Sequence, residues 1–90
     1  MVVFVLDDVP SSVKGELRRW LIEVRAGVFV GNLSGAVRDE LWARVCANSK
    51  TGSVLLLHPA STEQGFAIRT KRDRRRYPED FEGLTLMRFT

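Results

Sequence analysis

Residues 20–34, WLIEVRAGVFVGNLS, contain the corner on which the fold of this chain depends. Upstream of this stretch and within it, apolar residues recur at the spacing of one helical face. They are Val13, Leu17, Trp20, Leu21 and Val24. Gly27 then supplies the positive φ that commonly ends a helix, and the VFV run that follows is typical of a short buried strand. The sequence therefore predicts a helix over residues 12–25, a glycine stop and a strand over residues 28–30.

On either side of this corner the sequence alternates between strand and helix patterns. Residues 2–6, VVFVL, form a continuous apolar run that predicts a central strand buried on both faces. Ser11 or Ser12, next to Pro10, can cap the first helix. The other predicted elements are a helix over residues 34–48 capped by Ser34, strands over residues 53–58 and 65–71, and a final strand over residues 84–89. This order defines a two-layer α/β sandwich with the helices on one face of a sheet.

The composition is that of one globular domain. Of the 90 residues, 44% are hydrophobic and 28% are charged, which argues against a disordered chain. The N-terminal apolar run is too short to span a bilayer and lacks the features of a signal peptide. The single cysteine, Cys46, fits a reducing compartment. We therefore expect a cytoplasmic protein with no membrane partner, organised as one domain over residues 1–90 with a C-terminal arm or strand over about residues 72–90.

Positive charge is concentrated toward the C-terminal end of the chain. The net charge is +3, but residues 69–76, RTKRDRRR, hold six basic residues and one acidic residue, so the rest of the chain is net negative. Clustered arginines match phosphate oxygens and follow a nucleic-acid backbone without reading bases. A solvated charge run is the alternative, and the local concentration of charge favours nucleic acid. The candidate residues are Arg72, Arg74, Arg75 and Arg76.

Two adjacent acidic residues, Asp7 and Asp8, end the first predicted strand. Magnesium is typically held by one or two carboxylates with waters and substrate phosphates, so an acid here could serve a phosphodiesterase reaction. A carboxylate at the start of the following helix is the alternative. The residues alone favour this alternative, because no further carboxylate, histidine or lysine lies at motif spacing.

The remaining conspicuous side chains are expected to be structural. Trp20 and Trp42 accompany the apolar positions of their helices, so we expect them to pack in the core. His58 is the sole histidine, and with Cys46 distant on a helix the two cannot assemble a zinc site.

Residues 20–31 resemble the signature of the small CRISPR adaptation protein of the type I-E subtype. Members of the family that the chain resembles are often called CRISPR-associated endoribonucleases, and they partner the CRISPR integrase. The likeness covers nearly the whole chain through features in matching order. These are the acidic pair before Val9-Pro10, Ser34 opening a helix with Trp42, the TEQGF run at residues 62–66, Arg75-Arg76 and Gly83-Leu84.

The resemblance implies a ferredoxin-like fold of order βαββαβ and a symmetric homodimer. The elements predicted from the residues do not spell out this order, so the topology depends on the resemblance. By alignment on Val9-Pro10, Asp7 takes the position of the family's proposed metal ligand, with two copies facing each other across the dimer. Lys14, Arg75 and Arg76 match positions that contact duplex DNA in type I-E relatives. Ser12 stands where those relatives carry another arginine.

The resemblance also implies what the protein does. It describes a scaffold of spacer acquisition that holds foreign duplex DNA by shape and phosphate and bridges two integrase dimers. In this family the tail pairs with another subunit or docks the integrase, and we expect Leu84, Leu86 and Phe89 to be buried in such a contact. Two alternatives remain: a magnesium-dependent endonuclease, acting on RNA or DNA through Asp7, and an RNA-binding or ribonuclease module of the same fold.

Overall fold

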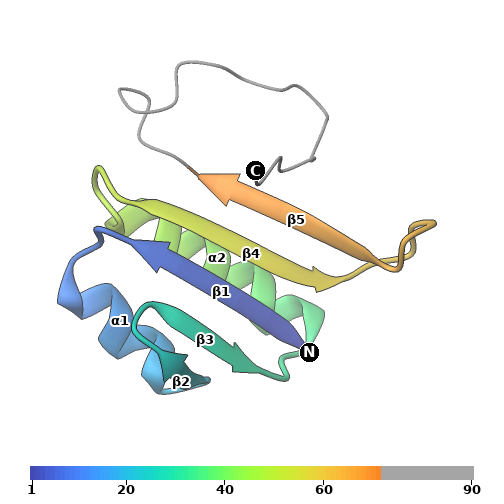
Figure 1. The fold of residues 1–90 in the computed structure, drawn as a ribbon, viewed down its shortest axis with the longest axis horizontal. Coiled ribbons are helices and arrows are strands. Elements are labelled where there is room, and N and C mark those ends of the chain that lie inside the picture. Colours follow the sequence, from blue (N-terminus) through green and yellow to red (C-terminus); the bar gives the residue numbers. More distant parts are fainter. Residues whose placement is uncertain (72–90) are drawn as a thin grey trace.

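The fold is built from five strands and two helices within residues 1–71, the part of the chain that this computed structural model describes (Figure 1). The elements in chain order are β1 (Val2–Asp7), α1 (Ser11–Arg18), β2 (Ile22–Arg25), β3 (Val28–Gly31), α2 (Gly35–Asn48), β4 (Ser53–Pro59) and β5 (Phe66–Lys71). The predicted arm and final strand, with Arg72, Arg74, Arg75, Arg76, Leu84, Leu86 and Phe89, lie outside the described residues.

The strands form one sheet in the order β2-β3-β1-β4-β5, and every neighbouring pair is antiparallel. Both helices cover the same face of this sheet (Figure 1). The first six elements follow the order βαββαβ, and β5 adds an edge strand beside β4. The predicted two-layer α/β sandwich with ferredoxin-like order is therefore confirmed.

The first helix is shorter than its apolar spacing predicted, and its last third is a strand. Helix α1 ends at Arg18, and Leu21 closes the final turn by donating its backbone N–H to the Leu17 carbonyl at 2.8 Å. Leu21 is buried as expected, but Trp20 is 48% exposed, so its predicted core position is wrong. The prediction failed because the apolar residues from Trp20 to Val24 fit both helical spacing and strand alternation.

Gly27 has the positive φ that the sequence predicted, +79°, but it turns a β-hairpin between β2 and β3 and does not end a helix. A Cβ at this position would lie 2.6 Å from the Leu6 carbonyl oxygen, so only glycine fits. The same approach lets Leu6 donate its N–H to the Gly27 carbonyl at 2.8 Å. The hairpin is thereby attached to the central strand.

The hairpin is held by a carboxylate, which makes its stability dependent on pH. Glu23 accepts hydrogen bonds from the Gly27 N–H at 3.0 Å and from Arg18 Nε at 2.9 Å. The Gly27 bond, followed by the Arg18 bond, lowers the pKa of the Glu23 carboxyl below its ordinary value. Folding therefore favours the ionised form, and the stabilisation is complete above the ordinary pKa and lost as the pH falls through the lower folded value.

We expect Glu23→Gln to destabilise the protein at neutral pH and to have a smaller effect in acid. Urea unfolding of both proteins at pH 7 and at lower pH measures this difference. Glu40→Gln, which removes a carboxylate from the exposed side of α2, serves as the control. An effect of Glu23→Gln that stays constant across this pH range would contradict the assignment.

Strand β1 is central, as predicted, but it is buried on one face only. Val2, Phe4 and Leu6 point into the core beneath the helices, whereas Val3 and Val5 lie on the other face. The prediction of burial on both faces is wrong for residues 1–71, because both helices cover the same face and the second face is apolar without a cover. The core side chains are Val2, Phe4, Leu6, Val13, Leu17, Leu21, Phe29, Leu41, Val45, Val54 and Leu56.

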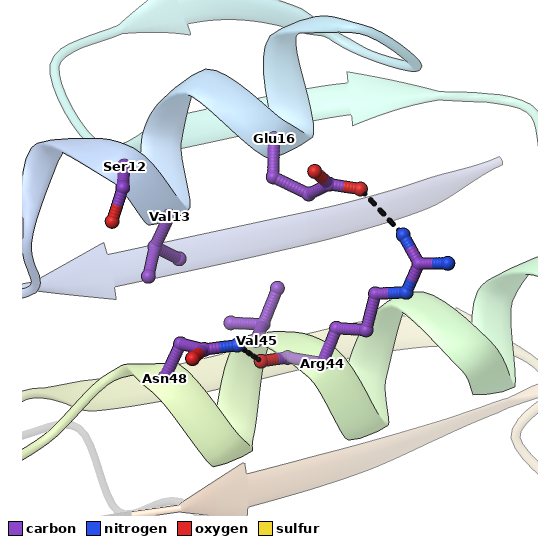
Figure 2. Close-up of a pocket in the computed structure, with 6 residues that line it drawn as sticks. All are labelled: Ser12, Val13, Glu16, Arg44, Val45 and Asn48. Atoms are coloured by element: carbon purple, nitrogen blue, oxygen red, sulfur yellow. Dashed lines mark hydrogen bonds and ion pairs between the residues drawn. The ribbon is translucent and has the colours of Figure 1, made fainter.

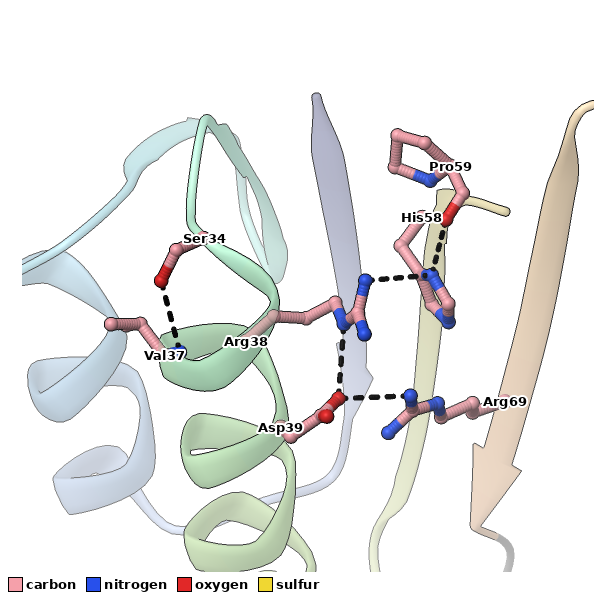
Figure 3. Close-up of polar contacts among 7 residues, drawn as sticks. All are labelled: Ser34, Val37, Arg38, Asp39, His58, Pro59 and Arg69. Carbon is pink, nitrogen blue, oxygen red and sulfur yellow. Dashed lines mark hydrogen bonds and ion pairs between the residues drawn. The ribbon is translucent and has the colours of Figure 1, made fainter. Parts of the chain in front are cut away.

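The second helix agrees with the sequence better than the first. Ser34 caps α2, and its Oγ accepts the Val37 N–H at 3.2 Å (Figure 3). Trp42 packs against the core, as predicted. The serine cap predicted for α1 is wrong, because Pro10 takes that position and no side chain caps the helix. Neither α1 nor α2 is long and apolar enough to cross a membrane.

Candidate nucleic-acid interface

One face of the sheet is mostly apolar and has no helix over it within residues 1–71; we call it the open face. Strand alternation and register place nine apolar side chains there. They are Val3, Val5, Ile22, Val28, Val30, Leu55, Leu57, Phe66 and Ile68. Ile22, Val5 and Phe66 are among the exposed large hydrophobic residues of the described chain. A contiguous apolar surface of this kind marks an interaction site on a soluble domain.

Asp7 ends β1 on this same open face, two residues beyond Val5, and its side chain is exposed. It lies opposite Ser53 of β4, and the backbone there is closely packed against Gly52. Asp8 follows with a positive φ of 58°, which turns the chain away from the sheet toward α1. Asp7 is thus presented at the carboxyl end of the strand, as the sequence predicted.

The donor set at Asp7 suits magnesium only in part. Carboxylate oxygen is the correct ligand for this hard cation. However, residues 1–71 contain no group of three or more His, Cys, Asp or Glu side chains that could hold a metal. Asp7 could hold Mg²⁺ only together with waters, substrate phosphates or a carboxylate from a second chain.

Basic side chains line the junction between β5 and α2. Arg69 and Lys71 project to the helix side of β5, where Arg69 Nη2 lies 2.9 Å from Asp39 Oδ1. The Lys71 ammonium donates to the carbonyls of Lys50 at 2.6 Å and Gly52 at 3.2 Å. These contacts attach the end of the edge strand to the loop after α2. The sequence continues directly from this point into the arginine-rich run.

Lys14 lies on α1, is partly buried and forms no ion pair with any residue of 1–71. Nearby, α1 and α2 border a half-open groove of about 250 Å³ (Figure 2). Arg44 crosses this groove to Glu16 at 2.8 Å and also pairs with Glu40 at 3.0 Å. Two carboxylates compensate one guanidinium, so the groove is a poor site for an anion.

A second basic cluster joins α2 to β4 and β5 (Figure 3). One oxygen, Asp39 Oδ1, accepts from Arg38 Nε at 3.0 Å and from Arg69 Nη2 at 2.9 Å. The hydrogen bond from Arg38, followed by that from Arg69, lowers the pKa of the Asp39 carboxyl below its ordinary value. Sequence reasoning missed this cluster, because only the fold brings Arg38 of α2 next to Arg69 of β5.

His58 forms the inner end of this cluster and is 95% buried, which agrees with the structural role expected for it. Its Nδ1 lies 2.8 Å from the Pro59 carbonyl oxygen and 3.2 Å from Arg38 Nη1. A carbonyl oxygen only accepts and a guanidinium N–H only donates, so Nδ1 forms a hydrogen bond with one of these two groups in either tautomer. Nε2 is buried without a hydrogen-bond partner among residues 1–71.

These features define a class of protein: a small ferredoxin-like α/β domain with a basic sheet edge and an apolar sheet face that no helix of residues 1–71 covers. Comparison with known families makes the assignment specific. The family model described as "CRISPR-associated protein (Cas_Cas2CT1978)" matches residues 1–86. The chain belongs to this family of CRISPR-associated proteins, and a CRISPR-related role follows.

Proposed function

We propose that this protein is a homodimeric scaffold of type I-E CRISPR adaptation, which holds foreign duplex DNA and bridges two integrase dimers. The observation that carries the proposal is the open face. A monomer leaves nine apolar side chains of five strands without a cover from residues 1–71. Two-fold pairing of identical faces buries such a surface with one self-complementary contact. A chain of only 90 residues buries a smaller fraction of its surface on folding than a larger domain does. Burial in a dimer contact therefore adds comparatively more to its stability.

The edge of β5 supports the proposed contact with duplex DNA. Arg69 and Lys71 lie on this strand, and the sequence adds Arg72, Arg74, Arg75 and Arg76 immediately after it. Arginine forks bind phosphate oxygens, and a row of them follows the duplex without reading its bases. Lys14 on α1 is the further basic residue proposed to contact the duplex.

We expect the Arg75→Ala/Arg76→Ala double variant to bind duplex DNA more weakly and with a shallower salt dependence. The slope of log affinity against log salt concentration should fall by about 0.9 for each phosphate contact removed. Fluorescence anisotropy of a labelled duplex at several salt concentrations measures both effects. The control is Arg19→Ala/Arg25→Ala, which removes the same charge near the opposite edge strand, β2. An unchanged slope in the Arg75/Arg76 variant would reject these contacts, and equally tight binding of single-stranded RNA would favour the RNA-binding interpretation.

The second candidate function is a magnesium-dependent endonuclease, favoured by the position of Asp7. Because Asp7 lies on the open face at the end of β1, pairing of two open faces would bring two Asp7 carboxylates toward each other. Two such carboxylates with a substrate phosphate would suit Mg²⁺, which would activate water and stabilise charge at the phosphate. Asp7 would then be both the metal ligand and the catalytic residue.

Spacer integration into a repeat-bearing plasmid, with the cognate integrase, distinguishes the two functions. Wild type, Asp7→Ala and Arg75→Ala/Arg76→Ala are compared in the same assay. A scaffold integrates normally with Asp7→Ala and fails with the arginine variant. Loss of integration with Asp7→Ala, in a protein that remains folded and dimeric, would make the metal site the leading explanation.

A further inference from the structure

Two arginines from different elements converge on a single carboxylate oxygen beside β5. Arg38 closes the first turn of α2 and Arg69 belongs to β5, and both donate to Asp39 Oδ1, at 3.0 Å and 2.9 Å (Figure 3). Their guanidinium groups are therefore held close together although they carry the same charge. One carboxylate compensates two cations, so the cluster keeps a net positive charge.

Among residues 1–71, no second acidic side chain forms an ion pair with Arg38 or Arg69. The next carboxylate on α2, that of Glu40, forms an ion pair with the Arg44 guanidinium at 3.0 Å. On the inner side, the cluster meets His58, whose buried Nε2 has no hydrogen-bond partner within the same residues. The two arginines thus have Asp39 as their single anionic partner in the described chain.

The carboxylate is the outermost member of the cluster. The Asp39 side chain is 53% exposed, whereas Arg38 is 19% and Arg69 is 33% exposed. The arginines are therefore less exposed than the carboxylate that they share, and a ligand from solvent that takes the place of Asp39 would contact both of them. Since its arginine neighbours lower the pKa of Asp39, the group remains ionised at neutral pH and compensates them there. An anionic oxygen between two guanidinium forks is also how a phosphate oxygen is bound.

We propose that Arg38 and Arg69 form a binding site for a backbone phosphate of duplex DNA, and that Asp39 occupies this site until the phosphate displaces it. The proposal rests on the proposed function, which supplies the duplex as ligand. Arg69 and the arginine-rich run belong to one continuous stretch of sequence that starts at this cluster. Asp39 then competes with the phosphate for the two arginines. The affinity of this surface for duplex DNA is therefore lower than it would be without the Asp39 charge.

Removal of the Asp39 charge should make the protein bind DNA more tightly. A substitution that only disturbed the structure would instead weaken binding. Asp39→Asn keeps the oxygen that accepts from both arginines but loses the negative charge. We expect the dissociation constant for a labelled duplex to fall about fivefold, the effect of one unit charge at close range in water. The slope of log affinity against log salt concentration should steepen by up to about 0.9, for one phosphate gained.

Glu40→Gln is the matched control, because it neutralises the next residue of the same helix and leaves the Arg38–Asp39–Arg69 cluster intact. We expect its affinity to stay within about twofold of wild type, since its charge is more distant from the site. Adding Arg69→Gln to Asp39→Asn should abolish the gain. Arg69→Gln alone should weaken binding in the otherwise unchanged chain.

Two results would overturn the inference while leaving the proposed function intact. An equal gain for Asp39→Asn and Glu40→Gln would show a general effect of net charge. Weaker binding by Asp39→Asn would show that Asp39 positions the arginines and does not compete with phosphate. If wild type and every variant fail to bind the duplex at low salt, the proposed function itself is wrong, and the inference falls with it.

Discussion

Replacing Val5 by arginine is expected to convert the proposed homodimer into a monomer. Val5 lies at the centre of the open face, 37% exposed, with Val28 and Leu55 opposite it on the neighbouring strands. In a two-fold contact each copy would bury one new charge near its symmetry mate. Unpaired like charges in an apolar contact cost several kcal/mol, which raises the dissociation constant of the dimer about a thousandfold or more.

Sedimentation equilibrium or light scattering over a range of concentrations measures this change. Ala43→Arg, which adds the same charge to an exposed position of α2, is the control and should remain dimeric. Circular dichroism establishes that both variants fold. A wild-type protein that is monomeric at all concentrations would reject the dimer, and a dimer that survives Val5→Arg would place its interface elsewhere.

Among the glycines of residues 1–71, Gly52→Ala is expected to produce the largest loss of stability of any alanine substitution. The added Cβ would clash with the carbonyl oxygen of Asp8 and would lie 2.7 Å from that of Asp7. Both are backbone atoms at the end of the central strand and cannot turn aside as a flexible side chain could. Relief requires separating β4 from β1, and we expect a cost of about 2–4 kcal/mol in the free energy of unfolding.

Chemical denaturation followed by circular dichroism measures this loss. Gly15→Ala is the control, because its Cβ would meet no atom within 4 Å and its position in α1 favours alanine. It should stabilise the protein by about 0.5–1 kcal/mol. If the two substitutions have similar effects, the close approach at Gly52 does not limit stability.

The sequence was sufficient for the parts of the fold whose pattern is local. Strands β1, β3, β4 and β5 and helix α2 lie where their apolar runs, caps and glycines predicted them. Strand β2 was missed because its four residues follow α1 closely and their side chains fit the helical face that precedes them. Only the hairpin with β3, turned at Gly27 and closed by Glu23, selects the strand. Pairing with a later segment thus overrides the local spacing.

The candidate site was predictable where it depends on strand ends and charge runs. Asp7 and the basic end of β5 follow directly from residue order. The shared carboxylate of Asp39 does not, because Arg38 and Arg69 meet only when β5 lies beside β4 and α2 packs against β4. Likewise, the run at residues 2–6 correctly predicted an apolar strand but could not show that one of its faces lacks a cover from residues 1–71.

The central position of β1 has a consequence for how the chain acquires its fold. β1 is synthesised before its neighbours β3 and β4, and β4 emerges only after α2 is complete. Contacts between segments so distant in sequence slow folding, because a long loop must close before the pairing stabilises it. Until β4 arrives, the nascent chain presents β1 with one unpaired edge, where a second nascent copy could dock. Translation speed through the β4 codons should therefore influence the yield of native protein.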